Sequence, residues 1–199
     1  MADAFILVGG LPWLDLVNTE PLRDGRRVDL LPGFAELVRW LQATGTLSEP
    51  AARRALRRWE GTDEGERVWR EALSLRAALR DGAERMAAGK PAGERMVRAV
   101  NRVLATRPAV TQVVRSGASY VRREDALEES ALQLLVPVAE SAAWLLTDGD
   151  PTLVRRCGGE RCVLHFYDTT KNRTRRWCSM DGCGSRAKAA AYYRRRRSA

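Results

Sequence analysis

The chain has 199 residues, of which 45% are hydrophobic and 30% are charged, and this composition predicts a sizeable packed core in one or two domains. No apolar run approaches the ~18 residues that a membrane-spanning helix needs. The first residues, MADAFILVGG, have no basic leader before their short apolar segment and do not match a secretory signal peptide. We therefore expect a cytoplasmic protein with no membrane partner.

The formal net charge of +9 is distributed unevenly along the chain. Residues 155–199 hold thirteen Lys and Arg against three Asp and Glu, whereas residues 1–154 are close to neutral. Such asymmetry predicts a polyanionic partner for the C-terminal part, most often nucleic acid. The alternative is a basic tail that only aids solubility.

The N-terminal part is expected to be mainly helical. Turn signals at Gly9-Gly10 and Asp24-Gly25 predict one or two short strands around a short helix or turn. Helical spacing of apolar residues then predicts helices over about 34–45, 48–61, 63–88 and 92–105, the second starting at Ser48. The inward residues expected for the first, third and fourth of these helices are Phe34, Leu37, Val38, Leu41, Val68, Ala72, Leu75, Leu79, Ala83, Met86, Val97, Val100 and Leu104.

A change of period marks the end of this helical run. Residues 109–115 and 118–124 alternate around Ser116-Gly117 and predict a β-hairpin. A long helix is expected from Asp125 to Thr147, with an acidic first turn and a kink at Pro137. The turn residues Asp148–Pro151 then separate two domains, which we place at 1–150 and 151–199.

All four cysteines lie in the second domain, as two C-x₄-C pairs that are 15 residues apart. They are Cys157, Cys162, Cys178 and Cys183. Four thiolates can close a tetrahedral shell around one Zn²⁺, and a segment this short needs a metal to fold. Disulfides and thiol redox chemistry are the alternatives, which a reducing compartment disfavours.

The thiolate set predicts a structural zinc rather than a catalytic one. Four protein ligands leave no open position for a water, and the single histidine, His165, lies in an apolar run where we expect it to pack. The chain also has no G-x-S-x-G, P-loop or G-x-G-x-x-G motif. We therefore expect a protein that is not an enzyme.

The second domain is expected to fold as a treble-clef-like zinc finger, which makes the whole chain α+β. The first cysteine pair would lie on a loop, residues 163–177 would form a hairpin with Lys171-Asn172 near its tip, and the second pair would open a C-terminal helix. Trp177 should pack over this hairpin. The roles of Tyr192 and Tyr193 are open: one could anchor the helix to the core while the other faces solvent. The basic residues expected to contact phosphates or guanine edges are Lys171, Arg173, Arg175, Arg176, Arg186, Lys188, Arg194 and Arg195.

These C-terminal motifs resemble the CGNR zinc finger. The matching stretches are Phe166-Tyr167-Asp168, Arg175–Met180 and Cys183–Arg186, with Lys188 at the next basic position. Ser185 stands where the family has Asn. Because serine also caps helices, zinc binding should survive, although a different sequence preference would follow if that Asn contacts DNA.

LDLVNTE at residues 14–20, together with Trp40-Leu41, resembles the ABATE domain that usually lies upstream of this finger. The resemblance implies a bacterial transcription regulator that binds duplex DNA, with an N-terminal domain that senses a small-molecule ligand or dimerises. A homodimer is expected because one finger reads few base pairs. An RNA-binding protein and a zinc-dependent protein-interaction module remain alternatives. Four polar residues could line a pocket or, as we expect, serve turns and caps: Asp15, Asn18, Thr19 and Glu20.

Overall fold

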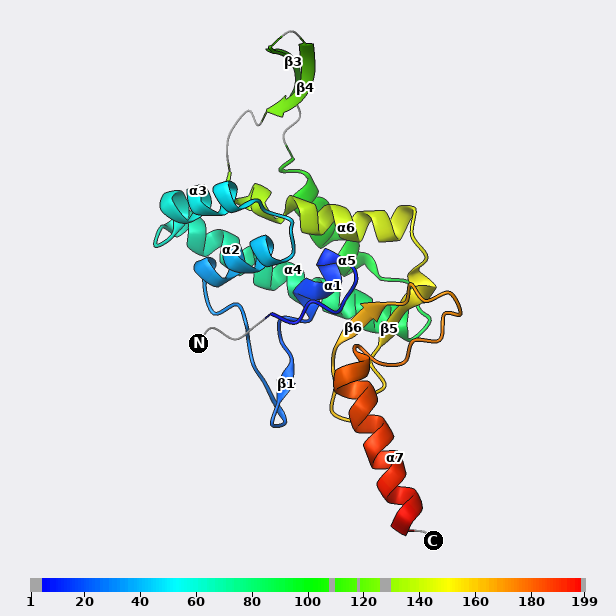
Figure 1. The fold of residues 1–199 in the computed structure, drawn as a ribbon. Coiled ribbons are helices and arrows are strands. Elements are labelled where there is room, and N and C mark those ends of the chain that lie inside the picture. The colour runs from blue at the N-terminus through cyan, green and yellow to red at the C-terminus, as the bar shows by residue number, and fades with distance from the viewer. Residues whose placement is uncertain (1–4, 108–109, 118, 126–129, 198–199) are drawn as a thin grey trace.

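The computed structural model describes residues 5–107, 110–117, 119–125 and 130–197. Within these ranges the chain forms a body of packed helices and three separate two-stranded antiparallel sheets (Figure 1). This arrangement confirms the α+β prediction. Among the described residues, no helix combines the length and the apolar character needed to cross a membrane.

The helical body is built around one long central helix, α4, which contacts α1, α2, α5 and β5. Thr62 caps α4 by accepting a hydrogen bond from the backbone N–H of Gly65 at 3.1 Å. The elements of the body are α1 (Pro12–Val17), α2 (Phe34–Ala43), α3 (Glu49–Trp59), α4 (Asp63–Ala87), α5 (Glu94–Leu104), the 3₁₀ helix η1 (Ala131–Leu135) and α6 (Val136–Thr147).

The core follows the helical periodicity of the sequence for α2 and α4. Every inward residue predicted for these two helices is buried, and Leu75 and Leu79 of α4 are fully so. Burying one such leucine contributes about 1.5–3 kcal/mol, so the apolar stripe of α4 is a main source of the body's stability.

The inward face of α5 differs from the prediction at Val97, whereas Val100 is buried as predicted. Val97 is 36% exposed, whereas Met96 and Val103 are buried. The reason is the close approach of α4, because a Cβ added at Gly82 would lie 2.1 Å from the Met96 sulfur. The missing side chain at Gly82 therefore lets Met96 pack inward.

The predicted β-hairpin is present as β3 (Val110–Ser116) and β4 (Ser119–Asp125), and it projects from the body at the end opposite α7 (Figure 1). The single long helix expected from Asp125 is wrong, because Asp125 ends β4 and α6 begins at Val136. Pro137 lies in the first turn of α6, where its missing N–H costs no hydrogen bond, and it does not kink a longer helix. Residues 126–129 of the predicted helix lie outside the described residues.

The chain after residue 150 forms the finger. Its elements are η2 (Pro151–Leu153), β5 (Val154–Arg156), β6 (His165–Tyr167), the π-helical turn η3 (Met180–Gly184) and α7 (Ser185–Arg197). The hairpin predicted over residues 163–177 is wrong, because β6 pairs with β5, with Val154 opposite Tyr167. The chain leaves β6 at Asp168 through a turn, so no strand follows it before Cys178.

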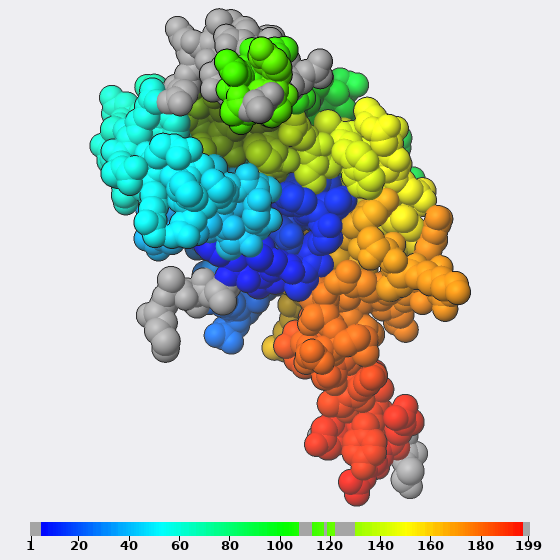
Figure 2. All heavy atoms as spheres, turned by 45° about the horizontal axis from the view of Figure 1, so that its top comes forward, coloured from blue at the N-terminus to red at the C-terminus, as the bar shows by residue number. Residues whose placement is uncertain are grey.

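The β5–β6 sheet belongs to the same core as the helices. Leu153, Val154 and Tyr167 are buried in that core, and the backbone N–H of Tyr167 donates to Gly9 O at 2.8 Å. The chain turns at Asp150, near the expected domain boundary, but packing is continuous across it. In contrast, α7 projects away from the body beyond its first turns (Figures 1 and 2).

Candidate metal centre

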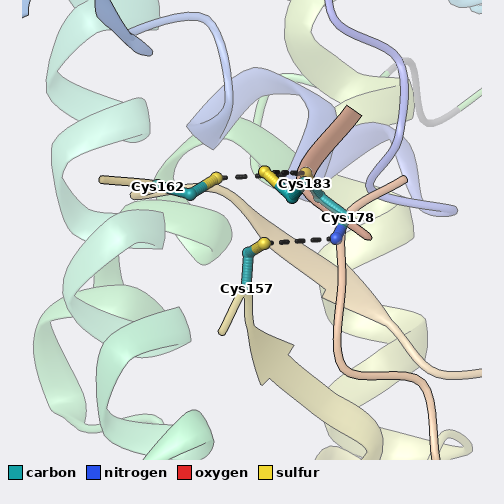
Figure 3. A group of neighbouring side chains, drawn as sticks. All are labelled: Cys157, Cys162, Cys178 and Cys183. Carbon is teal, nitrogen blue, oxygen red and sulfur yellow. Dashed lines mark hydrogen bonds between the residues drawn. The ribbon is translucent and has the colours of Figure 1, made fainter. Parts of the chain in front are cut away.

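Four cysteine side chains converge from four different places in the finger (Figure 3). Cys157 follows β5, Cys162 lies in the loop to β6, Cys178 ends the irregular segment, and Cys183 lies in η3. Their sulfur atoms all lie within 4.8 Å of one another, with 3.9 Å between Cys162 and Cys178 and 3.6 Å between Cys178 and Cys183.

This spacing fits a single tetrahedral zinc ion. Zinc–sulfur bonds of ~2.3 Å place the four sulfurs of a tetrahedron about 3.8 Å apart. All four cysteines are free of disulfides. The sulfurs also receive donors, since Cys178 N–H donates to Cys157 Sγ at 3.3 Å and Arg186 Nη2 to Cys183 Sγ at 3.1 Å. The four thiolates hold one structural zinc ion with a closed shell, as predicted.

The pKa values of the four-cysteine cluster show why it would bind a cation. The hydrogen bond to Cys162, together with burial, raises the pKa of Cys178, and burial raises the pKa of Cys183. The hydrogen bond from Cys178 lowers the pKa of Cys162 to about 5. A bound divalent cation offsets the repulsion that opposes further ionisation.

Two glycines let the first cysteine pair approach the second. A Cβ at Gly159 would lie 3.2 Å from Cys183 Sγ, and a Cβ at Gly158 would lie 3.2 Å from the ring of Trp177. Trp177 is half-buried and packs against the cysteine cluster, although the hairpin over which it was expected to pack does not form. The close contact of the two halves therefore depends on the pair Gly158-Gly159.

The polar residues around the cluster fix the irregular segment between β6 and Cys178. Asp168 is buried and accepts hydrogen bonds from the backbone N–H groups of Thr170 and Arg175, both at 3.0 Å. The Arg175 guanidinium lies 4.2 Å from the ring centre of Phe166 and donates to backbone oxygens, including Val8 O at 3.2 Å. These contacts position the second cysteine pair.

Two family models match the chain. The first, ABATE, is described as "putative stress-induced transcription regulator" and matches residues 10–149. The chain belongs to the ABATE family. The second, the CGNR zinc finger, matches residues 154–196 and so contains the whole cysteine cluster. No curated protein matches the chain.

The CGNR finger places most of the predicted nucleic-acid residues on its surface. The exposed ones are Lys171, Arg173, Arg176, Arg186, Lys188, Arg194 and Arg195. Arg175 is half-buried, and its guanidinium donates within the finger. Arg173 pairs with Asp150 at 3.3 Å, and Arg176 lies over Trp177. Contact of all eight residues with nucleic acid stays a prediction.

The start of α7 differs in detail from what the CGNR resemblance implied. Ser185 donates its hydroxyl to Met180 O at 3.0 Å and so closes η3 onto the helix. Tyr192 and Tyr193 are 50% and 65% exposed and contact each other edge to face, so the structure does not bear out the possibility that one of them anchors α7 to the core.

The ABATE motif LDLVNTE joins the helical body to the CGNR finger. Asn18 Nδ2 donates to His165 O at 2.8 Å, and His165 N–H donates back to Asn18 Oδ1 at 2.9 Å. Asp15 Oδ1 accepts from Gly9 N–H at 2.7 Å. Sequence reasoning gave these residues local turn or cap roles and missed the long-range pair. The only signal was a run of polar residues in an apolar stretch.

His165 itself is 1% exposed, which confirms that it packs rather than ligates. Its ring nitrogens have no hydrogen-bond partner among the described residues. Burial, with a smaller contribution from nearby arginines such as Arg156, lowers the pKa of His165 to about 4. The ring is therefore neutral at pH 7.

A second buried polar cluster in the ABATE region was not predicted. Arg76 of α4 is 3% exposed and forms two hydrogen bonds of 2.7 Å with Asp29, one of 2.9 Å with Thr19 and one of 3.1 Å with Glu20. Arg80 also pairs with Glu20. A charge buried this deeply needs such partners. The cluster ties the segment after α1 to the central helix.

Proposed function

We propose that this protein is a DNA-binding transcription regulator whose finger contacts duplex DNA. The observation that supports this most is α7, whose 13 residues contain no Asp or Glu. Its described basic side chains are exposed, and the helix projects away from the body (Figure 2). A helix with this charge that extends away from the body suits a polyanion.

In this proposal the metal centre fixes the position of the first turn of α7. Cys183 lies two residues before the helix, and Ser185 closes the turn between them. Bound zinc would supply the structural restraint that orients the helix. Arg186 and Lys188 lie at the start of α7 and would set the register on phosphates, while base edges in the major groove would add sequence preference.

The proposal is for a binding protein and not an enzyme. Four thiolates fill a tetrahedral shell, so the zinc ion would hold the finger together rather than activate a water. Regulation of chromosomal DNA would place the protein in the cytoplasm of a bacterium.

Fluorescence anisotropy with a labelled duplex pool tests the proposal on the zinc-loaded full chain. Log affinity should fall with log salt at ~0.9 per phosphate neutralised. The double variant Lys188→Ala/Arg194→Ala should lower affinity and salt slope together. A matched control, Arg67→Ala/Arg95→Ala, removes the same charge from exposed positions on α4 and α5 and should change neither.

Three outcomes would contradict the proposal. Tighter binding to structured or single-stranded RNA at the same salt would favour an RNA-binding protein. Binding to all nucleic acids no better than a polyarginine peptide would favour a protein-interaction module. Affinity that survives zinc removal would contradict the role given to the metal centre.

We also propose that the ABATE region senses a small organic anion. A cavity of about 530 Å³ lies between α3 and the η1–α6 segment, with Leu47, Ala55 and Leu134 on its apolar side and Arg54 and Arg57 on its polar side. This lining suits an apolar body with a carboxylate. Thermal unfolding with benzoate and other aromatic carboxylates should show stabilisation that Arg54→Ala/Arg57→Ala removes. Equal shifts for both proteins would contradict this assignment.

A single finger contacts few base pairs, so the proposal includes two chains on adjacent half-sites. Light scattering of the protein–DNA complex should give two chains per duplex. One chain per duplex would contradict the homodimer.

A further inference from the structure

A groove runs beside the metal centre between α7 and the hairpin of the ABATE region formed by β1 (Leu22–Arg23) and β2 (Arg26–Arg27). Its volume is about 620 Å³. Leu22 lines one side, the loop from Gly158 to Cys162 forms its floor, and Arg186, Ala190 and Arg194 line the α7 side. A smaller adjoining cavity of about 220 Å³ shares Leu22, Arg161 and Arg186. The hairpin and α7 project from the same side of the body (Figure 1).

The α7 wall of the groove has a regular pattern. Arg186, Ala190 and Arg194 are spaced by four residues and lie on one face of the helix. The two arginines are about 12 Å apart along the helix axis, which spans about three to four nucleotides of one strand. Ala190 between them, and Ala187 beside it, leave room for a backbone to approach.

The hairpin that contributes Leu22 to the groove also carries three arginines, Arg23, Arg26 and Arg27, which are not among the residues that line the groove. Arg26 and Arg27 are exposed, and Arg23 is half-buried. Arg26 has no hydrogen-bond or ion-pair partner among the described residues, and Arg27 makes only a long contact of 3.5 Å to Glu20 O. Arg26 therefore has no pairing role among the described residues, and the guanidinium of Arg27 makes one long contact only.

The hairpin presents these side chains on a well-anchored base. Its turn, Asp24-Gly25, has φ values of 49° and 79°, as in the tight turns that favour an Asp-Gly pair. The segments that enter and leave the hairpin are also joined, because Leu30 N–H donates to Thr19 O at 2.9 Å. The buried Arg76 cluster holds both ends of the hairpin, through Glu20 before it and Asp29 after it.

The charge of the groove selects its occupant. Arg161, Arg186 and Arg194 line it, and Glu160 is the one acidic residue among its lining residues. Arginine binds phosphate oxygens through paired N–H donors, and three arginines along one groove match a chain of phosphates better than a single anion.

Building on the proposed DNA binding of the finger, we propose that the β1–β2 hairpin is a second DNA-contacting element. The groove takes the sugar–phosphate backbone of one strand of the duplex, with α7 on one side and the hairpin arginines on the other. DNA binding is then shared between the ABATE region and the finger.

The variant Arg26→Ala/Arg27→Ala tests this in the full zinc-loaded chain, by anisotropy with the same duplex. Loss of two phosphate contacts should reduce the salt slope by about 1.8 and the affinity roughly tenfold. Arg67→Ala/Arg95→Ala removes the same charge from the helical body and should stay within twofold of wild type. Zinc content and thermal unfolding of all variants should match wild type, because these side chains are exposed.

A second measurement reports position rather than affinity. A photocrosslinking amino acid incorporated in place of Asp24, at the exposed tip of the hairpin, should crosslink to the duplex, whereas the same group in place of Arg95 should not. Unchanged affinity of the hairpin variant, or no crosslink from position 24, overturns the inference. If Lys188→Ala/Arg194→Ala still weakens binding, the proposed function stands without it. If wild type does not bind the duplex at all, both fail.

Discussion

Replacing Asn18 with alanine removes both hydrogen bonds that join α1 to β6. The side chain now satisfies the backbone carbonyl and N–H of His165, at 2.8 and 2.9 Å, and both residues are about 1% exposed. Each buried backbone group left without a partner costs about 1–3 kcal/mol. Asn18→Ala should therefore lower the free energy of unfolding by about 2–5 kcal/mol.

Urea denaturation of the zinc-loaded protein measures this loss. Asn101→Ala, at an exposed position of α5, is the matched control and should change stability by less than about 0.5 kcal/mol. Asn18→Asp keeps the acceptor for His165 N–H but loses the donor, so it should also destabilise at pH 7. A loss below about 1 kcal/mol for Asn18→Ala would refute the reasoning that this pair joins the body to the finger.

Three further predictions follow from buried or metal-binding groups. Arg76→Met should cost about 3–5 kcal/mol in urea denaturation, because Asp29 and Glu20 lose their buried partner, whereas removing the exposed Arg70 should cost under about 1 kcal/mol. His165 has a pKa of about 4, below its ordinary 6.5, so the unfolded chain takes up the proton first. Its contribution to stability is present above pH 6.5 and should be lost as pH falls towards 4, by at most about 3 kcal/mol, and His165→Leu should lack this part of the pH dependence. Elemental analysis should find one zinc per chain, and Cys178→Ser should lose it; zinc retained at full occupancy would contradict the four-thiolate site.

The sequence predicted those parts of the fold that depend on local periodicity or on ligand chemistry. The stripe of α4 from Val68 to Met86 follows from helical spacing, and the metal site follows from the two cysteine pairs. Both signals lie in residue type and spacing alone. The affinity of paired thiols for zinc comes from their own chemistry and does not depend on the fold around them.

The features that sequence reasoning missed depend on contacts between distant segments. Nothing local distinguishes Asn18 from a helix-capping residue, because its partner is 147 positions away. Strand pairing was missed for the same reason, since β6 could pair with a strand on either side of it and packing against α4 favours β5. The inward packing of Met96 on α5 depends on Gly82 of another helix, and the sequence of α5 itself gives no sign of that glycine.

The β5–β6 sheet, which carries Cys157 at its end and Tyr167 in the main core, has a thermodynamic consequence for the whole chain. Free energy released by zinc binding is transmitted to the helical body, because the sheet cannot unfold without disrupting both. By linkage, any ligand of the helices that changes zinc affinity must have its own affinity changed by zinc by the same factor. Zinc starvation would then reduce the stability of the helical body together with that of the finger, because both share this sheet.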